Sequence, residues 1–300
     1  MKMISKRIIA VAMAMLLGIS VISVGFSSEV KASESSDPLI YIALGDSVTE
    51  SVGVEPSYVS LINEAIGADY YINGGVSGCK SDNLLDGLRT NVDVRSCMTQ
   101  TDIVTVYIGF NDMAYYIISS MAEPLGCEPT MEAIGNKMYQ LQMEVENATG
   151  FDKYLAYMKL YNIATKMHDN LYTDSKIQAI VSEYKSNLNE IVKEIKALSP
   201  DTDIYLANLY QPYTGTDPVM LGSYKVYDMD EVLELWIAAY NDVIYEVASD
   251  YGYPVADVHS RLTLPSQLVG DPTTGNYDPH PNAEGQRVIA EAFLEKIVID

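Results

Sequence analysis

The sequence has few basic residues. Its 300 residues include 19 lysines and arginines against 41 aspartates and glutamates, so the formal net charge at pH 7 is −22. Nucleic acids and anionic membrane surfaces bind proteins through clustered lysine and arginine. The charge therefore argues against both as partners. It favours solubility and says nothing about the fold.

Cysteine is also scarce. Cys79, Cys97 and Cys127 are the only three in the chain, so one disulfide can form, by any of three pairings, and one thiol is left over. No two of them show the two-residue spacing of a zinc site, and we interpret them as structural residues rather than as a thiol nucleophile. Phosphate-loop and dinucleotide-binding motifs are absent as well. We expect no cofactor and no metal.

The one long hydrophobic run stands at the N-terminus. Basic residues in the first seven positions precede an apolar stretch over residues 8–26, and Val30-Lys31-Ala32 offers small residues where a signal peptidase cuts. We expect residues 1–32 to be a signal peptide and residues 33–300 to be a secreted domain without stable membrane insertion. The alternative is an uncleaved anchor, because the run is nearly long enough to span a bilayer.

Short apolar segments alternate with amphipathic ones in the rest of the chain. The apolar segments predict strands buried on both faces, at residues 39–44, 69–73, 102–108, 202–209 and 254–258. The amphipathic segments predict helices at residues 175–198 and 229–249, from 282 towards 297, and after the first strand, where Pro56 fits the first turn and Gly67 ends the helix. Such alternation predicts a parallel sheet with helices on both faces, which binds ligands at the carboxyl ends of its strands.

An insertion interrupts this alternation. Roughly seventy residues separate the third predicted strand from the helix at 175–198, far more than such a connection needs. The inserted residues, 113–174, are rich in methionine and tyrosine, and some of their apolar residues keep helical spacing. The simplest interpretation is a set of extra helices packed on the body. The alternative is a helical lid over the site, because methionine and aromatic surfaces suit apolar, variable ligands.

Four short motifs lie where a parallel sheet would bind a ligand. Three follow the first three predicted strands and the fourth precedes the last helix: Gly45-Asp46-Ser47-Val48-Thr49, Asn73-Gly74-Gly75-Val76-Ser77-Gly78, Gly109-Phe110-Asn111-Asp112 and Asp278-Pro279-His280-Pro281-Asn282. In order and placement they resemble the four blocks of the SGNH, or GDSL, hydrolases, with Val48 in place of the leucine of the commonest spelling. The resemblance implies a three-layer α/β/α fold with a flavodoxin-like parallel sheet of about five strands.

The resemblance implies that Ser47 is the nucleophile and His280 the general base. A serine hydroxyl is hardly ionised at neutral pH, so it needs a base within reach and a group that holds this base in the right tautomer. From the residues alone, Ser47 could instead cap the next helix. The other histidines are His168, in the insertion, and His259, after the fifth predicted strand.

Asp278 is the expected acid, although its spacing departs from the family pattern. In that pattern the acid precedes the histidine by three positions, whereas Asp278 precedes His280 by two and Tyr277 holds the usual place. Asp278 could still orient the imidazole. Asp257, Asp271 or a backbone carbonyl could serve instead.

The resemblance also implies an oxyanion hole, built from the second and third motifs. Gly78 would donate its backbone N–H, since a glycine lets the backbone approach the developing oxyanion without a Cβ in the way. Asn111 would donate a side-chain N–H, which does not titrate. The structural alternatives are a flexible turn at Gly78 and a helix cap at Asn111 or Asp112.

These residues predict a secreted serine hydrolase that cleaves carboxylic esters, of lipase or esterase type, through a Ser-His-Asp acyl-enzyme mechanism. Its partner would be a small-molecule or lipid ester. A carbohydrate O-deacetylase, a lysophospholipase and a thioesterase are alternatives on the same fold, because a fold does not choose a substrate. A non-catalytic extracellular binding protein is the alternative from another class. The oligomeric state stays open.

Overall fold

The computed structural model describes residues 27–30, 38–213, 219–221, 224–270 and 278–299. Its centre is a sheet of five parallel strands: β2 (Ile40–Gly45), β3 (Tyr70–Gly75), β4 (Ile103–Tyr107), β5 (Asp203–Ala207) and β8 (Val255–Ala256). They lie in the order β3-β2-β4-β5-β8, which is the flavodoxin-like order. A short strand β1 (Ser27–Val30) adds to β3 in antiparallel orientation. The predicted fold class is confirmed.

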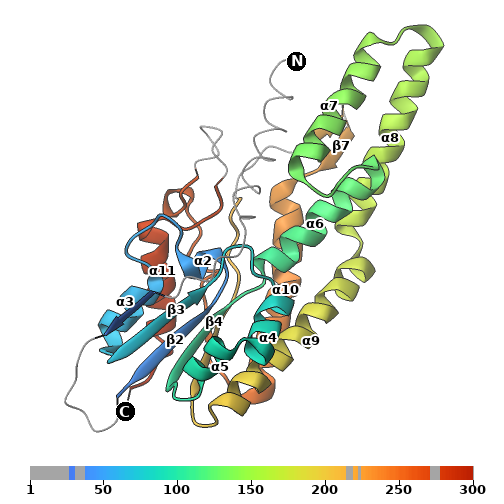
Figure 1. Ribbon diagram of the computed structural model, residues 1–300. Helices are drawn as coiled ribbons and strands as arrows, with labels where there is room; N and C mark the ends of the chain where they lie inside the picture. The colour runs from blue at the N-terminus through green and yellow to red at the C-terminus, as the bar shows by residue number, and fades with distance from the viewer. Residues whose placement is uncertain (1–26, 31–37, 214–218, 222–223, 271–277, 300) are drawn as a thin grey trace.

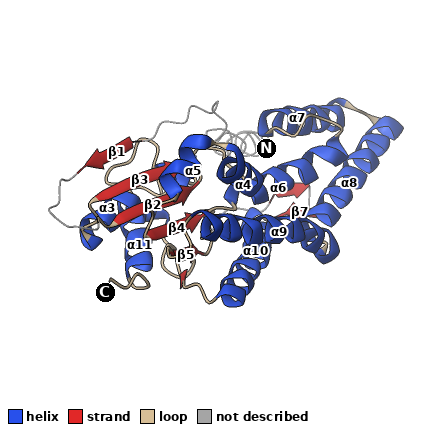
Figure 2. Ribbon diagram, turned by 60° about the horizontal axis from the view of Figure 1, so that its bottom comes forward, coloured by secondary structure: helices blue, strands red, loops and turns tan. Residues whose placement is uncertain are grey.

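Helices cover both faces of the sheet (Figure 1, Figure 2). On one face, α3 (Tyr58–Ile66) packs against α11 (Ala283–Leu294). The layer on the other face is formed by α4 (Ser81–Thr90), α5 (Val92–Met98), α9 (Asp174–Leu198) and α10 (Met229–Tyr251). The handedness of the connections explains why the helices divide between two faces. Each connection between parallel strands is right-handed, and the step from β2 to β3 runs along the sheet in the opposite direction to the steps from β3 to β4, β4 to β5 and β5 to β8.

The first long helix begins later than the sequence predicts. α3 starts at Tyr58, and its N-cap is Ser57, whose Oγ accepts a hydrogen bond from the Ser60 backbone N–H at 3.0 Å. Pro56 therefore precedes the cap and does not occupy the first turn, so that prediction is wrong. The serine sets the start because its side chain satisfies an otherwise unpaired N–H. Gly67 ends the helix as expected, with φ at 69°.

The sequence analysis did not predict several short elements. They are α2 (Ser47–Glu50), α4, α5, and a hairpin of β6 (Val219–Leu221) and β7 (Tyr224–Tyr227). α2 and α5 have only four and seven residues. Elements of this length are too short for a helical repeat to show in the sequence.

The insertion is helical. Residues 113–174 hold α7 (Met131–Asn147), α8 (Gly150–Tyr172) and most of α6 (Phe110–Leu125), which begins inside the third motif. α8 packs against α6, α7, α9 and α10, and Trp236 of α10 donates from Nε1 to the Leu171 carbonyl at 3.0 Å. The second half of α8 is thereby attached to the body. Its first half and α7 project beyond the end of the sheet at which α2 lies (Figure 1).

The N-terminal leader falls largely outside the described residues. Of the expected signal peptide, residues 1–32, only Ser27–Val30 are described, as strand β1. Within the described ranges, no helix is both long enough and apolar enough to cross a lipid bilayer. Cleavage and export stay predictions.

All three cysteines carry free thiols, so the disulfide that the sequence allows does not form. Cys79 precedes α4 and Cys97 lies in α5, and both line an apolar cavity of about 150 Å³ between these helices and the sheet. Cys127 follows α6. Burial raises the pKa of Cys79 to about 12, which keeps this thiol protonated and unreactive at neutral pH.

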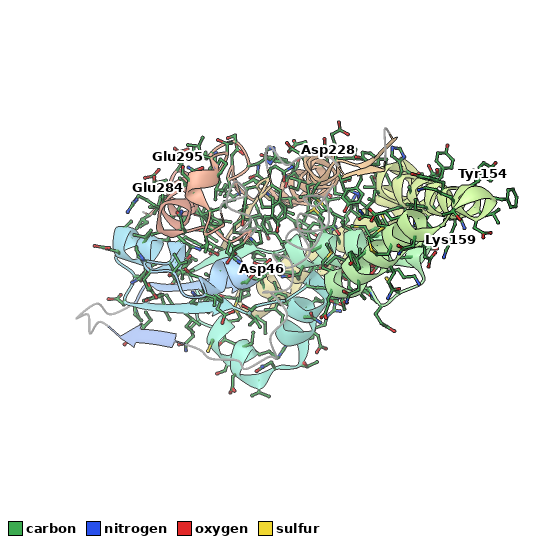
Figure 3. The ribbon with its side chains drawn as sticks, turned by 90° about the horizontal axis from the view of Figure 1, so that it is seen from above. Asp46, Tyr154, Lys159, Asp228, Glu284 and Glu295 are labelled. Atoms are coloured by element: carbon green, nitrogen blue, oxygen red, sulfur yellow. The ribbon has the colours of Figure 1, made fainter. Side chains whose placement is uncertain are left out.

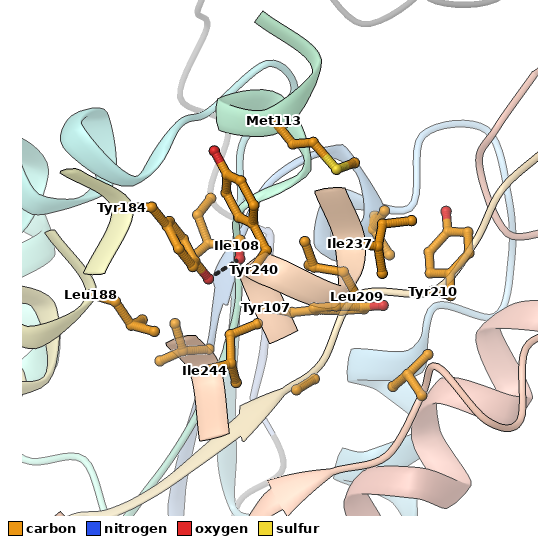
Figure 4. Packing of buried hydrophobic residues seen from close by; sticks show 14 of the residues in the cluster. Tyr107, Ile108, Met113, Tyr184, Leu188, Leu209, Tyr210, Ile237, Tyr240 and Ile244 are labelled. Atoms are coloured by element: carbon orange, nitrogen blue, oxygen red, sulfur yellow. Dashed lines mark hydrogen bonds between the residues drawn. The ribbon is translucent and has the colours of Figure 1, made fainter. Parts of the chain in front are cut away.

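A cluster of buried aromatic residues joins the helical layer to the carboxyl end of β4 (Figure 4). Tyr184 of α9 donates its hydroxyl to the Ile108 carbonyl at 2.9 Å, and its ring centroid lies 4.6 Å from that of Tyr240 in α10. The Tyr184 ring also fills the space beside Gly109, where a Cβ would lie 3.0 Å from the tyrosine hydroxyl. This packing holds the backbone that leads into Asn111.

Candidate active site

Ser47 lies at the turn from β2 into α2, at the carboxyl end of the sheet. Asp46 is the N-cap of α2, and its side chain accepts a hydrogen bond from the Val48 N–H at 3.0 Å. The cap is therefore Asp46, and the idea that Ser47 caps the helix is wrong. A glycine is required at position 45, because a Cβ there would lie 2.0 Å from Thr49 Oγ1.

His280 reaches Ser47 from the other end of the chain. Its Nε2 lies 2.9 Å from Ser47 Oγ, across 233 residues of sequence. Its Nδ1 lies 2.7 Å from Asp278 Oδ1, which also accepts the His280 backbone N–H at 3.0 Å. An acid two positions before the histidine can thus contact the ring, because the chain between them folds into a tight turn. The carbonyl of Pro279 in this turn accepts the Tyr210 hydroxyl at 2.7 Å.

The environment of Asp278 favours its charged form. Partial burial alone would raise the pKa of this carboxyl, but the two hydrogen bonds from His280 and the charge of that ring outweigh it and lower the pKa below its usual value. The carboxylate therefore stays ionised at neutral pH. An ionised partner at Nδ1 holds the proton on that nitrogen and leaves Nε2 to accept one.

The alternative bases and acids lie elsewhere. His259 Nδ1 is 3.0 Å from the Leu209 carbonyl, and His168 belongs to α8. Asp257 accepts hydrogen bonds from the N–H and hydroxyl of Ser260 and from Nδ2 of Asn208, which follows β5. Asp271 lies outside the described residues. None of the described alternatives contacts the Ser47 hydroxyl.

The two expected oxyanion donors are linked to each other. Gly78 lies in the turn after β3, with φ at 76°, and within the described residues its backbone N–H has no acceptor. Asn111 lines the same pocket as Ser47, and its Nδ2 donates to the Cys79 carbonyl at 3.0 Å. The N-cap of α6 is Gly109, so the cap alternative for Asn111 and Asp112 is wrong. One amide hydrogen of Asn111 holds the turn, and the second is left for a ligand.

Hydrogen bonds connect the end of β3 to α2, the helix that begins with Ser47. Asn73 Nδ2 donates to the Thr49 carbonyl at 2.8 Å, and the N–H and hydroxyl of Ser77 both donate to Glu50 Oε2, at 2.7 and 2.5 Å. At Gly75 the two backbones nearly touch, since a Cβ would lie 2.1 Å from the Glu50 nitrogen. These contacts fix the turn of Gly78 relative to α2.

A buried polar network behind Asn111 was missed by sequence reasoning. Asp112 accepts the Ser81 N–H at 2.9 Å and the Ser81 hydroxyl at 2.5 Å, and Asn187 Nδ2 of α9 donates to the same hydroxyl at 3.0 Å. Burial raises the pKa of Asp112 to about 6, although the Ser81 hydrogen bonds oppose this. In the sequence, the network could have been suspected only from Asn187, a polar residue that lies beside the apolar repeat of α9.

Asp46, which is labelled in Figure 3, is a second buried carboxyl and directly precedes Ser47 in the chain. It is 1% exposed, and within the described residues its Oδ2 has no hydrogen-bond partner. Burial raises the pKa of Asp46 to about 7, against the opposing hydrogen bond from Val48 and the charge of His280. Its protonation therefore changes near neutral pH.

A mostly apolar pocket of about 90 Å³ opens onto the reactive groups. Ser47, Asn111 and His280 line it together with apolar and aromatic side chains from α6, α10 and the segment after β5, among them Phe110, Met113, Ile117, Tyr210, Tyr213 and Leu233. Such a lining suits an acyl chain with its carbonyl at the polar end. Among the described residues, no three histidine, cysteine or acidic side chains are grouped to hold a metal ion.

Known proteins resemble this chain in sequence pattern and in fold. The sequence model of the GDSL-like lipase/acylhydrolase family matches residues 43–288. No curated protein sequence matches. Among solved structures, the lipase Lip_vut3 from a goat rumen metagenome has a TM-score of 0.54 at 17% identity, over 86% of this chain and 97% of that chain.

Two further solved structures have the same fold. A catalytic mutant of an acetylxylan esterase from Geobacillus stearothermophilus has a TM-score of 0.52 at 17% identity, over 89% of this chain and 98% of that chain. The phospholipase A1 from Streptomyces albidoflavus NA297 has a TM-score of 0.50 at 15% identity, over 87% of this chain and 100% of that chain.

Proposed function

We propose, since this chain belongs to the GDSL-like lipase/acylhydrolase family and is a carboxylic ester hydrolase, that it is exported and cleaves lipid or simple acyl esters through an acyl-enzyme on Ser47. The observation that carries the proposal is the 2.9 Å contact between Ser47 Oγ and His280 Nε2. The apolar pocket beside these two atoms supports an acyl substrate. The N-terminal apolar run supports export.

In the first half of the reaction, Ser47 Oγ attacks the ester carbonyl carbon while His280 Nε2 takes the hydroxyl proton. The carbonyl electron pair moves to oxygen, and the N–H groups of Ser47 and Gly78 and the free amide hydrogen of Asn111 stabilise that oxyanion. When the oxyanion collapses, the bond to the alcohol oxygen breaks. His280 gives its proton to this oxygen, and the acyl group stays on Ser47.

In the second half, water replaces the alcohol. His280 takes one proton from the water as its oxygen attacks the acyl carbon, and the same donors stabilise the second oxyanion. The bond to Ser47 Oγ then breaks, Oγ recovers the proton from His280, and the carboxylic acid leaves. Throughout, Asp278 stabilises the imidazolium and keeps the ring oriented.

Covalent labelling tests the nucleophile directly. A fluorophosphonate probe should label the wild-type protein at Ser47, as mapped by peptide mass spectrometry, and should not label Ser47→Ala. Labelling also separates this proposal from the non-catalytic binding protein, which would not react. A wild-type protein with a native circular-dichroism spectrum and no labelling would contradict the proposal.

A carbohydrate O-deacetylase is the second candidate. It is favoured by the small pocket volume, about 90 Å³, and by the shared fold of the acetylxylan esterase. A panel of p-nitrophenyl acetate, butyrate and octanoate together with acetylated xylan separates the two. Preference for the longer esters supports the lipid substrate, and release of acetate from xylan at a higher rate supports the deacetylase.

A further inference from the structure

The first half of α8 exposes apolar and aromatic side chains to solvent. Phe151, Tyr154 and Leu155 are 72, 57 and 50% exposed, and Tyr157 and Met158 are also among the exposed large side chains. We call these five residues the α8 tip. Phe151, Tyr154, Leu155 and Met158 recur at three- and four-residue intervals, so they lie along one side of the helix.

The tip does not serve the packing of the insertion. The buried residues of α8 all lie in its second half, from Leu160 onward. That half holds the Trp236 bond to the Leu171 carbonyl, which attaches α8 to the body, and the Asn170 bond to the Ser120 carbonyl of α6, within the insertion. Exposed apolar residues gathered on one element mark a binding surface more often than chance.

The charge of this region differs from that of the whole chain. α7 and α8 together contain four lysines and five acidic residues, so their formal charge is only −1 with His168 neutral, in a chain of net charge −22. Lys159 pairs with Glu144 of α7 at 2.7 Å. An anionic surface would repel the acidic body, whereas a zwitterionic surface would not. Tyrosine rings combine an apolar body with a polar hydroxyl, which suits the boundary between headgroups and acyl chains.

The position of the tip relates it to the site. The helices α7 and α8 project beyond the end of the sheet at which α2 and Ser47 lie (Figure 1), and Tyr154 lies at the far end of the projection (Figure 3). α6, which packs on α8, also forms a wall of the substrate pocket through Met113 and Ile117. A surface bound by the tip would therefore lie on the side from which esters reach Ser47.

We propose that the α8 tip docks this enzyme onto zwitterionic lipid surfaces, so that it acts on esters presented in a bilayer or aggregate. This inference rests on the proposed lipid-ester function. Docking is reversible, because five side chains from one helix bury far less apolar area than a membrane-spanning segment. It concentrates the enzyme at its substrate and takes no part in the chemical steps.

Vesicle sedimentation tests the docking independently of catalysis. Wild type and the inactive Ser47→Ala should both co-sediment with phosphatidylcholine vesicles, and less with vesicles rich in phosphatidylglycerol. The variant Phe151→Ser/Tyr154→Ser/Leu155→Ser should bind phosphatidylcholine at least about tenfold more weakly, because three apolar side chains no longer leave water. The matched control is Val92→Ser/Tyr251→Ser/Val298→Ser, which removes exposed apolar side chains outside the insertion and should bind like wild type.

Comparing turnover of a vesicle-borne ester with turnover of a soluble ester tests the docking separately from the proposed esterase function. The tip variant should lose turnover of an ester carried in phosphatidylcholine vesicles relative to its own turnover of soluble p-nitrophenyl acetate, and the control should keep the wild-type ratio. Equal vesicle binding by the tip variant and wild type, or wild type that does not bind, overturns the docking. So does a wild-type dimer that becomes a monomer in the tip variant on analytical ultracentrifugation. Failure of wild type on every soluble ester overturns the proposed function instead.

Discussion

Two carboxylates near Ser47 have opposite environments. Asp278 is held ionised because His280 donates two hydrogen bonds to it. Asp46 is buried, has one hydrogen bond from Val48, and titrates near neutral pH. Environments that separate the pKa values of neighbouring acids assign them different roles. In the proposed mechanism Asp278 orients the base, whereas Asp46 caps the helix that begins with Ser47.

Asp278→Asn tests the orienting acid. The amide oxygen could still accept the His280 backbone N–H, but it would not stabilise the imidazolium, and the amide could favour the wrong ring tautomer. We expect kcat for p-nitrophenyl acetate to fall by about 10³- to 10⁴-fold with a similar melting temperature. Activity close to wild type at neutral pH would show that another group orients the ring.

Asn111→Ala tests the side-chain oxyanion donor. Loss of one such donor typically costs on the order of 10²- to 10³-fold in kcat. The variant also loses the bond to the Cys79 carbonyl, so we expect a loss of about 1 kcal/mol in the free energy of unfolding. Steady-state kinetics and urea unfolding measure the two effects separately. A variant with wild-type kcat would exclude Asn111 from the oxyanion hole.

Asp46→Asn tests the buried acid through stability. Folding raises the pKa of Asp46 from 3.8 to about 7, so the fold favours the protonated carboxyl. The stability linked to this group is fully present below pH 3.8 and is lost as the pH rises through 7. The amide cannot ionise and can still accept the Val48 N–H. Between pH 4 and pH 8 the free energy of unfolding should therefore fall less in the variant than in wild type. The difference between the two losses should be up to about 4 kcal/mol.

Urea unfolding at pH 4, 6 and 8 measures this difference. The remaining slope in the variant belongs partly to Asp112, whose pKa is raised to about 6 by burial. Parallel pH profiles for the two proteins would mean that Asp46 is ionised in the fold throughout this range.

At the scale of elements, the site depends on the close contact of β3 with α2. Gly75 of the second motif serves this contact, because the two backbones there leave no room for a side chain. Gly78 follows in the turn, with its positive φ. The motif is therefore structural at its start and, in the proposed mechanism, functional at its end.

Gly75→Ala tests the contact between β3 and α2. Its Cβ would lie 2.1 Å from the Glu50 nitrogen, and since both sides are backbone, α2 must move. We expect a loss of about 3 kcal/mol or more in unfolding free energy and a marked loss of esterase activity, as Ser47 moves with α2. Gly87→Ala is the matched control: nothing lies within 4 Å of its Cβ, and a helical alanine should be neutral or stabilising by up to about 1 kcal/mol. Equal stability of the two variants would contradict this account.

At the scale of the whole molecule, the insertion and the α/β body are packed as one unit. The chain has a single tryptophan, and Trp236 of α10 is fully buried where it bonds to α8. α10 also contacts β5 and β8 of the sheet. The tryptophan therefore reports on the junction between the insertion and the body.

We expect thermal unfolding to occur in one transition. The midpoint seen by tryptophan fluorescence should coincide with that seen by circular dichroism at 222 nm, because separating α8 from α10 exposes a core shared by both parts. A fluorescence midpoint several degrees lower would show that the insertion detaches first.

Local pattern was sufficient for the framework. All five predicted strand segments overlap an observed strand, and the long helices α9, α10 and α11 begin within one residue of their predicted starts. Local pattern did not predict short elements such as α2. It also misplaced the start of α3, in whose first turn Pro56 was expected. Their limits depend on a single cap, Ser57 or Asp46, and not on a repeat.

By itself, the sequence determined the layers and the candidate residues, because hydrophobic periodicity and short motifs are local properties of the chain, whereas the strand order was implied only by the resemblance to the SGNH hydrolases. Only the tertiary structure decided which side chains meet. The contact of Ser47 with His280 spans 233 residues. The contact of His280 with Asp278, and not with Asp257, depends on the turn at Pro279, and the Asp112 network draws on α4 and α9. Such pairings are set by how whole elements pack, and no local spacing encodes them.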